Sequence, residues 1–160
     1  MRGGAALELR EALSGRGLTS FVKTTGGKGL HIVAPLTPNA RAGWDACFTF
    51  ARDLAQDAAR KSPRAYVTVV SKAQREGRIL IDYLRNNRGA TSVAAYSTRA
   101  RANVPVSAPI RWEELDARLT PDAYTVKNLL RRLASMRRDP WAGYDEVRQS
   151  LPVEKRRSAK

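Results

Sequence analysis

Cysteine and histidine each occur only once in this 160-residue chain. A lone Cys47 cannot form an intramolecular disulfide, so we expect a reducing compartment. One cysteine and one histidine, His31, also exclude the usual ligand sets for zinc. A chain of this length can bury one core without such links, so the sequence predicts a single domain that folds by apolar burial.

Long apolar runs are also lacking. No run approaches the roughly 20 residues needed to cross a bilayer, and the first residues have no signal-peptide core. We therefore expect a soluble, cytoplasmic protein with no membrane partner. Residues 1–149 are assigned to the domain, and residues 150–160 to a disordered basic tail because they are charged and poor in apolar residues.

Acidic residues are scarce, with 15 Asp and Glu against 29 Lys and Arg, which gives a formal net charge of +14. An excess of this size favours phosphate-rich partners through steering and counterion release. The short basic clusters, Arg131-Arg132, Arg137-Arg138 and 155–157, are typical of solvated faces when taken alone. The charge therefore indicates a nucleic acid or a nucleotide as the partner, but it does not distinguish between the two.

The most informative segment is Lys23-Thr-Thr-Gly-Gly-Lys-Gly-Leu-His31, which lies between apolar runs at 19–23 and 31–34. Glycines let backbone N–H groups converge on phosphate oxygens, and Lys28 adds a positive charge for the same oxygens. Because strands flank the turn, we expect a hairpin and not a Walker loop, which needs a helix after its lysine. An ordinary basic hairpin turn is the alternative.

A second informative segment runs from Arg78 to Asn86 and alternates like a strand. The alternation places Asp82 in an apolar row with Leu80 and Leu84. A carboxylate there is costly unless it meets a cation, so a metal ion or a nearby arginine such as Arg85 is expected. A structural aspartate that faces water or pairs with an arginine is the alternative.

The remaining patterns predict an α/β (α+β) fold, with a mixed, mainly antiparallel sheet and flanking helices. Helices are expected over 5–13 and 42–60, with the aromatic side chains Trp44 and Phe48 in the core. Strands are expected over 65–70 and 91–96. A last helix should begin with Thr120 as its N-cap and end at Asp139-Pro140, after which Trp141 and Tyr144 fold back onto the body.

These segments together resemble the polymerase domain of bacterial DNA ligase D, in the archaeo-eukaryotic primase superfamily. The matching stretches follow in order over nearly the whole chain: 18–23, 25–31, 77–89, 96–101 and 105–112. The resemblance implies a primase-polymerase fold with an RRM-like palm. It also implies nucleotidyl transfer onto DNA ends in non-homologous end-joining double-strand-break repair, beside the nucleoid, with Ku and an ATP-dependent DNA ligase as partners.

The resemblance also implies roles for single residues. Asp82 matches a metal-binding carboxylate, which with His31 makes up the catalytic pair expected here, and Mn²⁺ or Mg²⁺ would be the cofactor. The ribo- or deoxyribonucleoside triphosphate would be bound by ten residues: Thr25, Gly26, Gly27, Lys28, Gly29, His31, Arg85, Asn86, Arg99 and Arg101. Thr25 stands where the family usually has serine.

One family motif has no counterpart. An Asp-x-Asp pair should precede the glycine loop, but only Glu8 and Glu11 are acidic before Lys23. The similar spacing at 114–116 lies in a polar segment and is interpreted as structural. We therefore expect residues 1–149 to be the C-terminal part of a primase-polymerase domain, inactive alone and self-associating or pairing with a missing N-terminal half. The alternatives are an inactive nucleotide- or DNA-binding module and a degenerate remnant.

Overall fold

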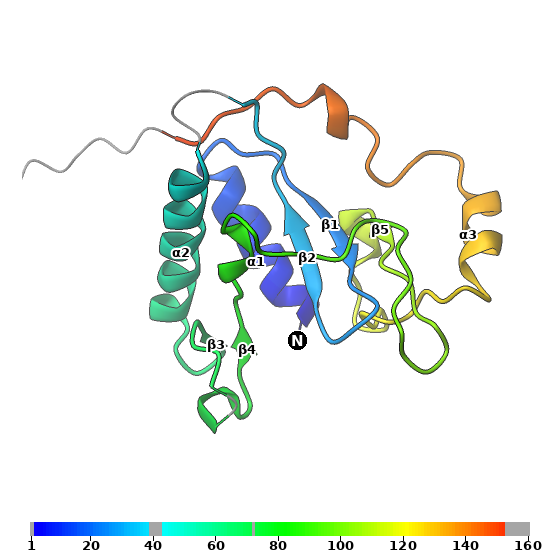
Figure 1. Ribbon diagram of the computed structural model, residues 1–160, viewed down its shortest axis with the longest axis horizontal. Helices are drawn as coiled ribbons and strands as arrows, with labels where there is room; N and C mark the ends of the chain where they lie inside the picture. The colour runs from blue at the N-terminus through cyan, green and yellow to red at the C-terminus, as the bar shows by residue number, and fades with distance from the viewer. Residues whose placement is uncertain (1, 39–42, 72, 153–160) are drawn as a thin grey trace, which may run out of the picture.

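The computed structural model describes residues 2–38, 43–71 and 73–152 (Figure 1). The helices are α1 (Arg2–Ser14), α2 (Trp44–Lys61) and α3 (Leu129–Ser135). The strands are β1 (Phe21–Thr24), β2 (Leu30–Val33), β3 (Tyr66–Val67), β4 (Ile79–Leu80) and β5 (Pro109–Ile110). Short 3₁₀ helices lie at Ala73–Arg75, Leu84–Asn86, Trp112–Glu114 and Tyr144–Glu146. No helix within the described residues is both long and apolar enough to span a bilayer.

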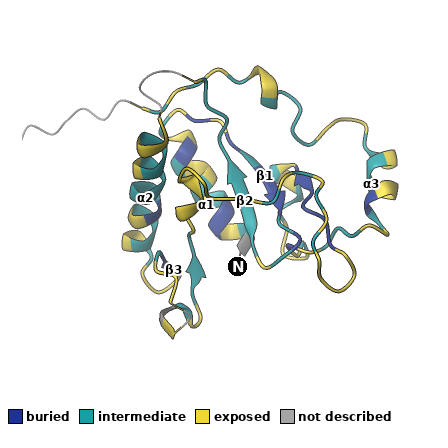
Figure 2. Cartoon of the chain, in the orientation of Figure 1, coloured by how far each residue is buried: buried dark blue, intermediate teal, exposed yellow. Residues whose placement is uncertain are grey.

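The main sheet has the order β2-β1-β5, and both pairings are antiparallel. Lys23 pairs with His31 across β1 and β2, so their side chains lie on the same face of the sheet. The opposite face carries Val22 and Ile110, which are buried. Helix α1 contacts β2, and some of its residues line the same groove as Lys23 and His31. Figure 2 shows the buried residues gathered in α1, β1 and the segment around β5. The hairpin expected over 19–34 is therefore confirmed.

A smaller parallel sheet pairs β3 with β4, beside α2. The helix expected over 42–60 is present, although residue 42 lies outside the described residues. Phe48 packs edge-on against Tyr83, with ring centroids 5.4 Å apart. The prediction that Trp44 is a core residue is wrong, because Trp44 is 58% exposed in the first turn of α2, one turn before that contact.

The strand expected over 78–86 is also wrong in its extent. Only Ile79 and Leu80 pair, and Leu84–Asn86 form a 3₁₀ helix. The physical reason is local: Asp82 Oδ1 accepts a hydrogen bond from the Leu84 N–H at 3.1 Å, which turns the backbone out of the extended conformation. Asp82 therefore leaves the apolar row that simple alternation assigned to it.

The last helix begins eight residues later than expected, with Asn128 and not Thr120 as its N-cap. Thr125 instead forms an isolated antiparallel bridge with Pro105, where Val106 N donates to Tyr124 O at 2.7 Å and Val126 N donates to Val104 O at 3.2 Å. These tertiary hydrogen bonds override the helical start signal. The helix also ends early, at Ser135 and not at Asp139-Pro140.

Two further strands differ from expectation. The strand expected over 65–70 is reduced to β3, and residues 91–96 form no strand. Tyr96 has a φ of +62°, a left-handed conformation that an extended strand cannot contain.

The C-terminal segment does return to the body, as expected. Trp141 Nε1 donates to Val22 O at 2.8 Å, and the Trp141 ring stacks on Tyr144 at a centroid distance of 5.0 Å. Of the tail expected over 150–160, residues 153–160 lie outside the described residues.

Candidate functional site

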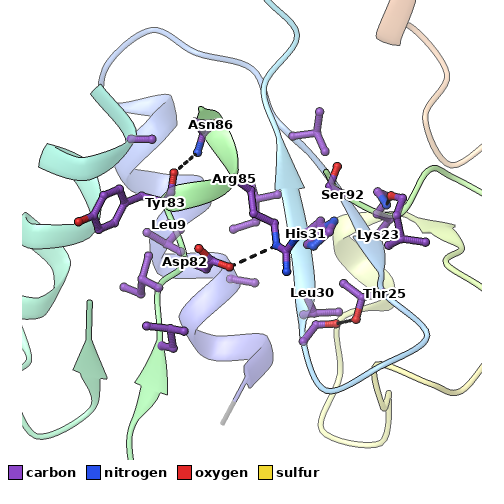
Figure 3. Close-up of a pocket in the computed structure, with 18 of the residues that line it drawn as sticks. Leu9, Lys23, Thr25, Leu30, His31, Asp82, Tyr83, Arg85, Asn86 and Ser92 are labelled. Carbon is purple, nitrogen blue, oxygen red and sulfur yellow. Dashed lines mark hydrogen bonds and ion pairs between the residues drawn. The ribbon is translucent and has the colours of Figure 1, made fainter. Parts of the chain in front are cut away.

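A groove opens between the β1–β2 hairpin, the segment 91–101 and the segment that follows β4 (Figure 3). Nearly all residues singled out from the sequence line it: Thr25, Gly27, Lys28, Gly29, His31, Asp82, Arg85, Asn86, Arg99 and Arg101. Gly26 is buried just behind its neighbours in the same turn. The fold thus brings together side chains that are more than 70 positions apart in the sequence.

The glycine turn is closed by hydrogen bonds at its base. Thr25 Oγ1 donates to Gly29 O at 2.7 Å, and Gly26 N donates to Pro121 O at 2.9 Å. Gly26 has a φ of +62°, which disfavours any residue with a Cβ. The turn is therefore fixed before any ligand arrives.

Two arginines from the 98–106 segment lie against this turn. A Cβ on Gly26 would lie 2.8 Å from Arg99 Cγ, and one on Gly27 would lie 3.9 Å from Arg101 Cζ. Lys28 is exposed at the tip of the turn. Glycines at these positions therefore let cationic side chains approach the backbone closely, which favours an anion as the ligand.

Sequence reasoning missed a buried polar network directly under the turn. Lys23 Nζ donates to Ser107 Oγ at 2.8 Å and to Val93 O, and Ser107 Oγ donates to Thr24 O at 2.8 Å. Burial, together with the positive charge of Arg99, lowers the pKa of Lys23 to about 8. The strand register, which puts Lys23 opposite His31, was the signal that could have identified this lysine.

His31 lies on β2 beside this network and is half-buried. Burial, followed by the positive charge of Lys23, lowers its pKa to about 4, and the Asp82 carboxylate only partly opposes that shift. At neutral pH the imidazole is therefore uncharged, with one N–H donor and one acceptor nitrogen.

The opposite wall of the groove carries Asp82. Its Oδ2 lies 3.3 Å from Arg85 Nε, and its side chain is 38% exposed. Arg85 also donates to Thr91 O, and Asn86 Nδ2 donates to Tyr83 O at 2.9 Å. The sequence left a metal ion or an arginine as the partner of Asp82, and in the structure Arg85 forms an ion pair with it. Figure 3 shows Arg85 reaching from Asp82 toward His31.

The residues present do not fit a complete divalent-metal site. In the described part of the chain, no group of three or more His, Cys, Asp or Glu side chains gathers in a way that could hold a metal ion. Mg²⁺ needs near-octahedral oxygen ligands, whereas Asp82 is one carboxylate with an oxygen already facing Arg85.

The other acidic spacing, at 114–116, is structural as expected. Glu114 forms an ion pair with Arg132 and accepts from Arg111 N at 2.7 Å, while Asp116 accepts from the backbone of Arg118 and Leu119.

The fold and the groove define a mixed α+β domain in which an antiparallel hairpin presents a glycine turn and cations to one open groove. The family model described as "LigD, primase-polymerase domain" matches residues 3–141. The chain belongs to this family.

Individual proteins of the same family are similar to the chain in sequence. The chain is 44% identical over 142 residues to the multifunctional non-homologous end joining protein LigD of Pseudomonas aeruginosa, and 31% identical over 129 residues to the bifunctional LigD of Bacillus subtilis. These alignments cover 88% and 81% of this chain, but 17% and 21% of the relatives.

A solved structure is also similar: the polymerase domain of Mycobacterium tuberculosis ligase D in complex with DNA. The TM-score is 0.74 at 30% identity, over 82% of this chain and 45% of that one. The chain therefore spans less than half of the solved domain and about a fifth of the curated relatives.

Proposed function

We propose that this chain supplies the triphosphate-binding wall of a LigD-type primase-polymerase that acts on DNA ends in non-homologous end joining. The observation that carries the proposal is the glycine turn with Arg99 and Arg101 packed against it. Lys28, Thr25, Gly26, Gly27, Gly29 and His31 would hold the β- and γ-phosphates, and Arg85 and Asn86 would face the ligand from the other wall.

Charge and hydrogen-bonding capacity support this assignment. Triphosphate oxygens accept hydrogen bonds from backbone N–H groups and from arginine, often in pairs. The neutral imidazole of His31 can donate one further N–H. The groove offers these donors on a wall that hydrogen bonds fix in advance, so little ordering cost remains for the ligand to overcome.

Chemistry by the chain alone is not part of the proposal. The family transfers nucleotides, a reaction that generally uses divalent metal ions to neutralise charge in the transition state. Asp82 alone does not meet that requirement, so we infer that the chain binds nucleotide without extending a primer. DNA ends, Ku and a DNA ligase are partners proposed from the relatives' role, and the net charge of +14 favours the DNA.

Calorimetric titration with a nucleoside triphosphate tests the proposal. Lys28→Ala should weaken binding by about 3- to 10-fold, because a charge-assisted contact is lost. Lys127→Ala removes an exposed lysine outside the groove and should change nothing. The triphosphate site would be excluded if the wild-type chain did not bind, or if Lys28→Ala bound as tightly as Lys127→Ala.

A primer-extension assay with Mn²⁺ or Mg²⁺ tests the second half of the proposal. We expect no added nucleotides, since removal of metal carboxylates costs orders of magnitude in rate. Template-dependent extension that Asp82→Ala abolishes would show that the chain is a complete enzyme.

A further inference from the structure

Lys23 is a buried cation without a carboxylate partner. Its residue surface is 4% exposed, and no ion pair within the described residues includes it. A buried charge normally requires a counter-charge, because it has lost its hydration. The desolvation of Lys23 is thus not offset by any carboxylate among the described residues.

The hydrogen bonds of Lys23 are also incomplete. An ammonium has three N–H donors, and the described residues supply two acceptors, Ser107 Oγ and Val93 O. Both acceptors are neutral. The side chain lines the groove and lies on the same sheet face as His31. One N–H of the ammonium therefore has no acceptor among the described residues, in a side chain that borders the groove.

The groups around Lys23 increase the positive charge. Besides Lys23, the charged groups that line the same groove, together with the imidazole of His31 from β2, are Lys28 from the turn, Arg99 and Arg101 from the 98–106 segment, Arg75, Glu76 and Arg78 from the segment before β4, and Asp82 and Arg85 from the segment after it. Cys47, Tyr83 and Tyr144 are the other titratable groups that line it. Asp82 is paired with Arg85. The wall with Lys23 therefore has a surplus of cations that a bound polyanion would neutralise.

We propose that Lys23 is a polyphosphate-binding residue, whose charge stays unpaired in the free protein and is neutralised by the anion held in the glycine turn. This inference rests on the proposed function and adds a ligand contact that lies beneath the turn and not on its surface. Ser107 and Val93 hold the ammonium in place, so the charge is positioned in advance.

Ligand binding and the protonation of Lys23 are linked. Burial lowers the pKa of Lys23 to about 8, so the free protein loses this proton in mildly alkaline solution. A phosphate beside the ammonium favours the charged form and raises its pKa. Ligand binding should therefore take up a proton near pH 8, and binding should weaken as the pH rises above that value.

Calorimetric titration of the whole chain with inorganic triphosphate, without metal, tests the inference. At about pH 7, Lys23→Met should weaken binding by about 10-fold or more, the usual effect of one charged hydrogen bond. At about pH 9.5 the gap between wild type and variant should narrow, because Lys23 is then uncharged in the free wild-type protein. Lys127→Met is the matched exposed control and should bind like wild type at both pH values.

The outcomes separate the two claims. Absence of binding by the wild-type chain overturns the proposed function and this inference with it. Wild-type binding with an equal loss in Lys23→Met at both pH values indicates a merely structural lysine and overturns the inference alone. If Lys23→Met does not fold, wild-type titrations near pH 8 in two buffers of different ionisation enthalpy measure the net number of protons exchanged on binding. Net proton uptake by the complex supports the inference, and the absence of net uptake overturns it.

Discussion

The two walls of the groove differ in where their polar contacts lie. On the β1–β2 wall, which includes Lys23 and the glycine turn, the contacts are buried, whereas on the wall with Asp82 and Arg85 they are exposed to solvent. Ser107 and Thr24 are fully buried and bonded to each other on the first wall. On the second, Asp82 and Arg85 form an ion pair with side chains 38% and 53% exposed. Buried hydrogen bonds fix geometry strongly, while exposed ion pairs contribute little. One wall is therefore preorganised, and the other can adjust to what it meets.

The largest expected effect comes from the preorganised wall. Gly26→Ala places a Cβ 2.8 Å from Arg99 Cγ and 3.2 Å from the Pro105 carbonyl at a positive φ. Strain and overpacking should lower the free energy of unfolding by about 2–4 kcal/mol. Urea denaturation measures this. Gly29→Ala, where the new Cβ meets nothing within 4 Å, should cost under about 1 kcal/mol; equal losses would contradict a fixed turn.

Ser107→Ala should have the next largest effect. It removes an acceptor of the buried Lys23 ammonium and a donor to Thr24 O, and unsatisfied buried groups cost about 1–3 kcal/mol. Thermal and urea melts should show a clear loss of stability. Ser92→Ala, at an exposed serine that lines the same groove, is the control and should leave the melts unchanged. If Ser107→Ala also left the stability unchanged, the buried hydrogen bonds of Lys23, Ser107 and Thr24 would not be what fixes this wall.

The pH dependence of stability should report the depressed pKa of His31. The folded-state pKa of His31 is about 4, below its ordinary 6.5, so the unfolded chain binds the proton first as the pH falls. The His31 contribution to stability is therefore present above about pH 6.5 and is lost between there and pH 4, with a slope of up to about 1.4 kcal/mol per pH unit. Urea melts of wild type and His31→Gln should differ in slope over that range, and parallel curves would contradict the shift.

The smallest effect is expected on the adjustable wall. Arg85→Gln breaks an exposed ion pair, which should change stability by less than about 0.5 kcal/mol, and added salt should mask the difference. A loss above about 2 kcal/mol in the same urea assay would show that this wall is as rigid as the other.

The sequence predicted what local chemistry determines. Glycines, a threonine and a lysine between two apolar runs identified the turn, and the structure confirms the hairpin. It failed where distant segments decide the outcome. The pairing of 104–106 with 124–126 displaced the helix start expected at Thr120, and the acceptors of Lys23 lie 70 and 84 positions away. For Asp82, a local side-chain hydrogen bond outweighed the alternation on which the strand prediction depended.

The hydrogen bond from Gly26 N to Pro121 O also has a consequence for the order of folding. The strands on either side of the turn are synthesised before this acceptor, which follows Gly26 by 95 residues. The indole that donates to Val22 O lies 119 positions after Val22. Contacts of such separation form late, after the loop-closure entropy has been overcome. On the ribosome, a nascent chain that ends before residue 121 thus contains the whole glycine turn in its sequence, yet lacks one of the two hydrogen bonds that close it.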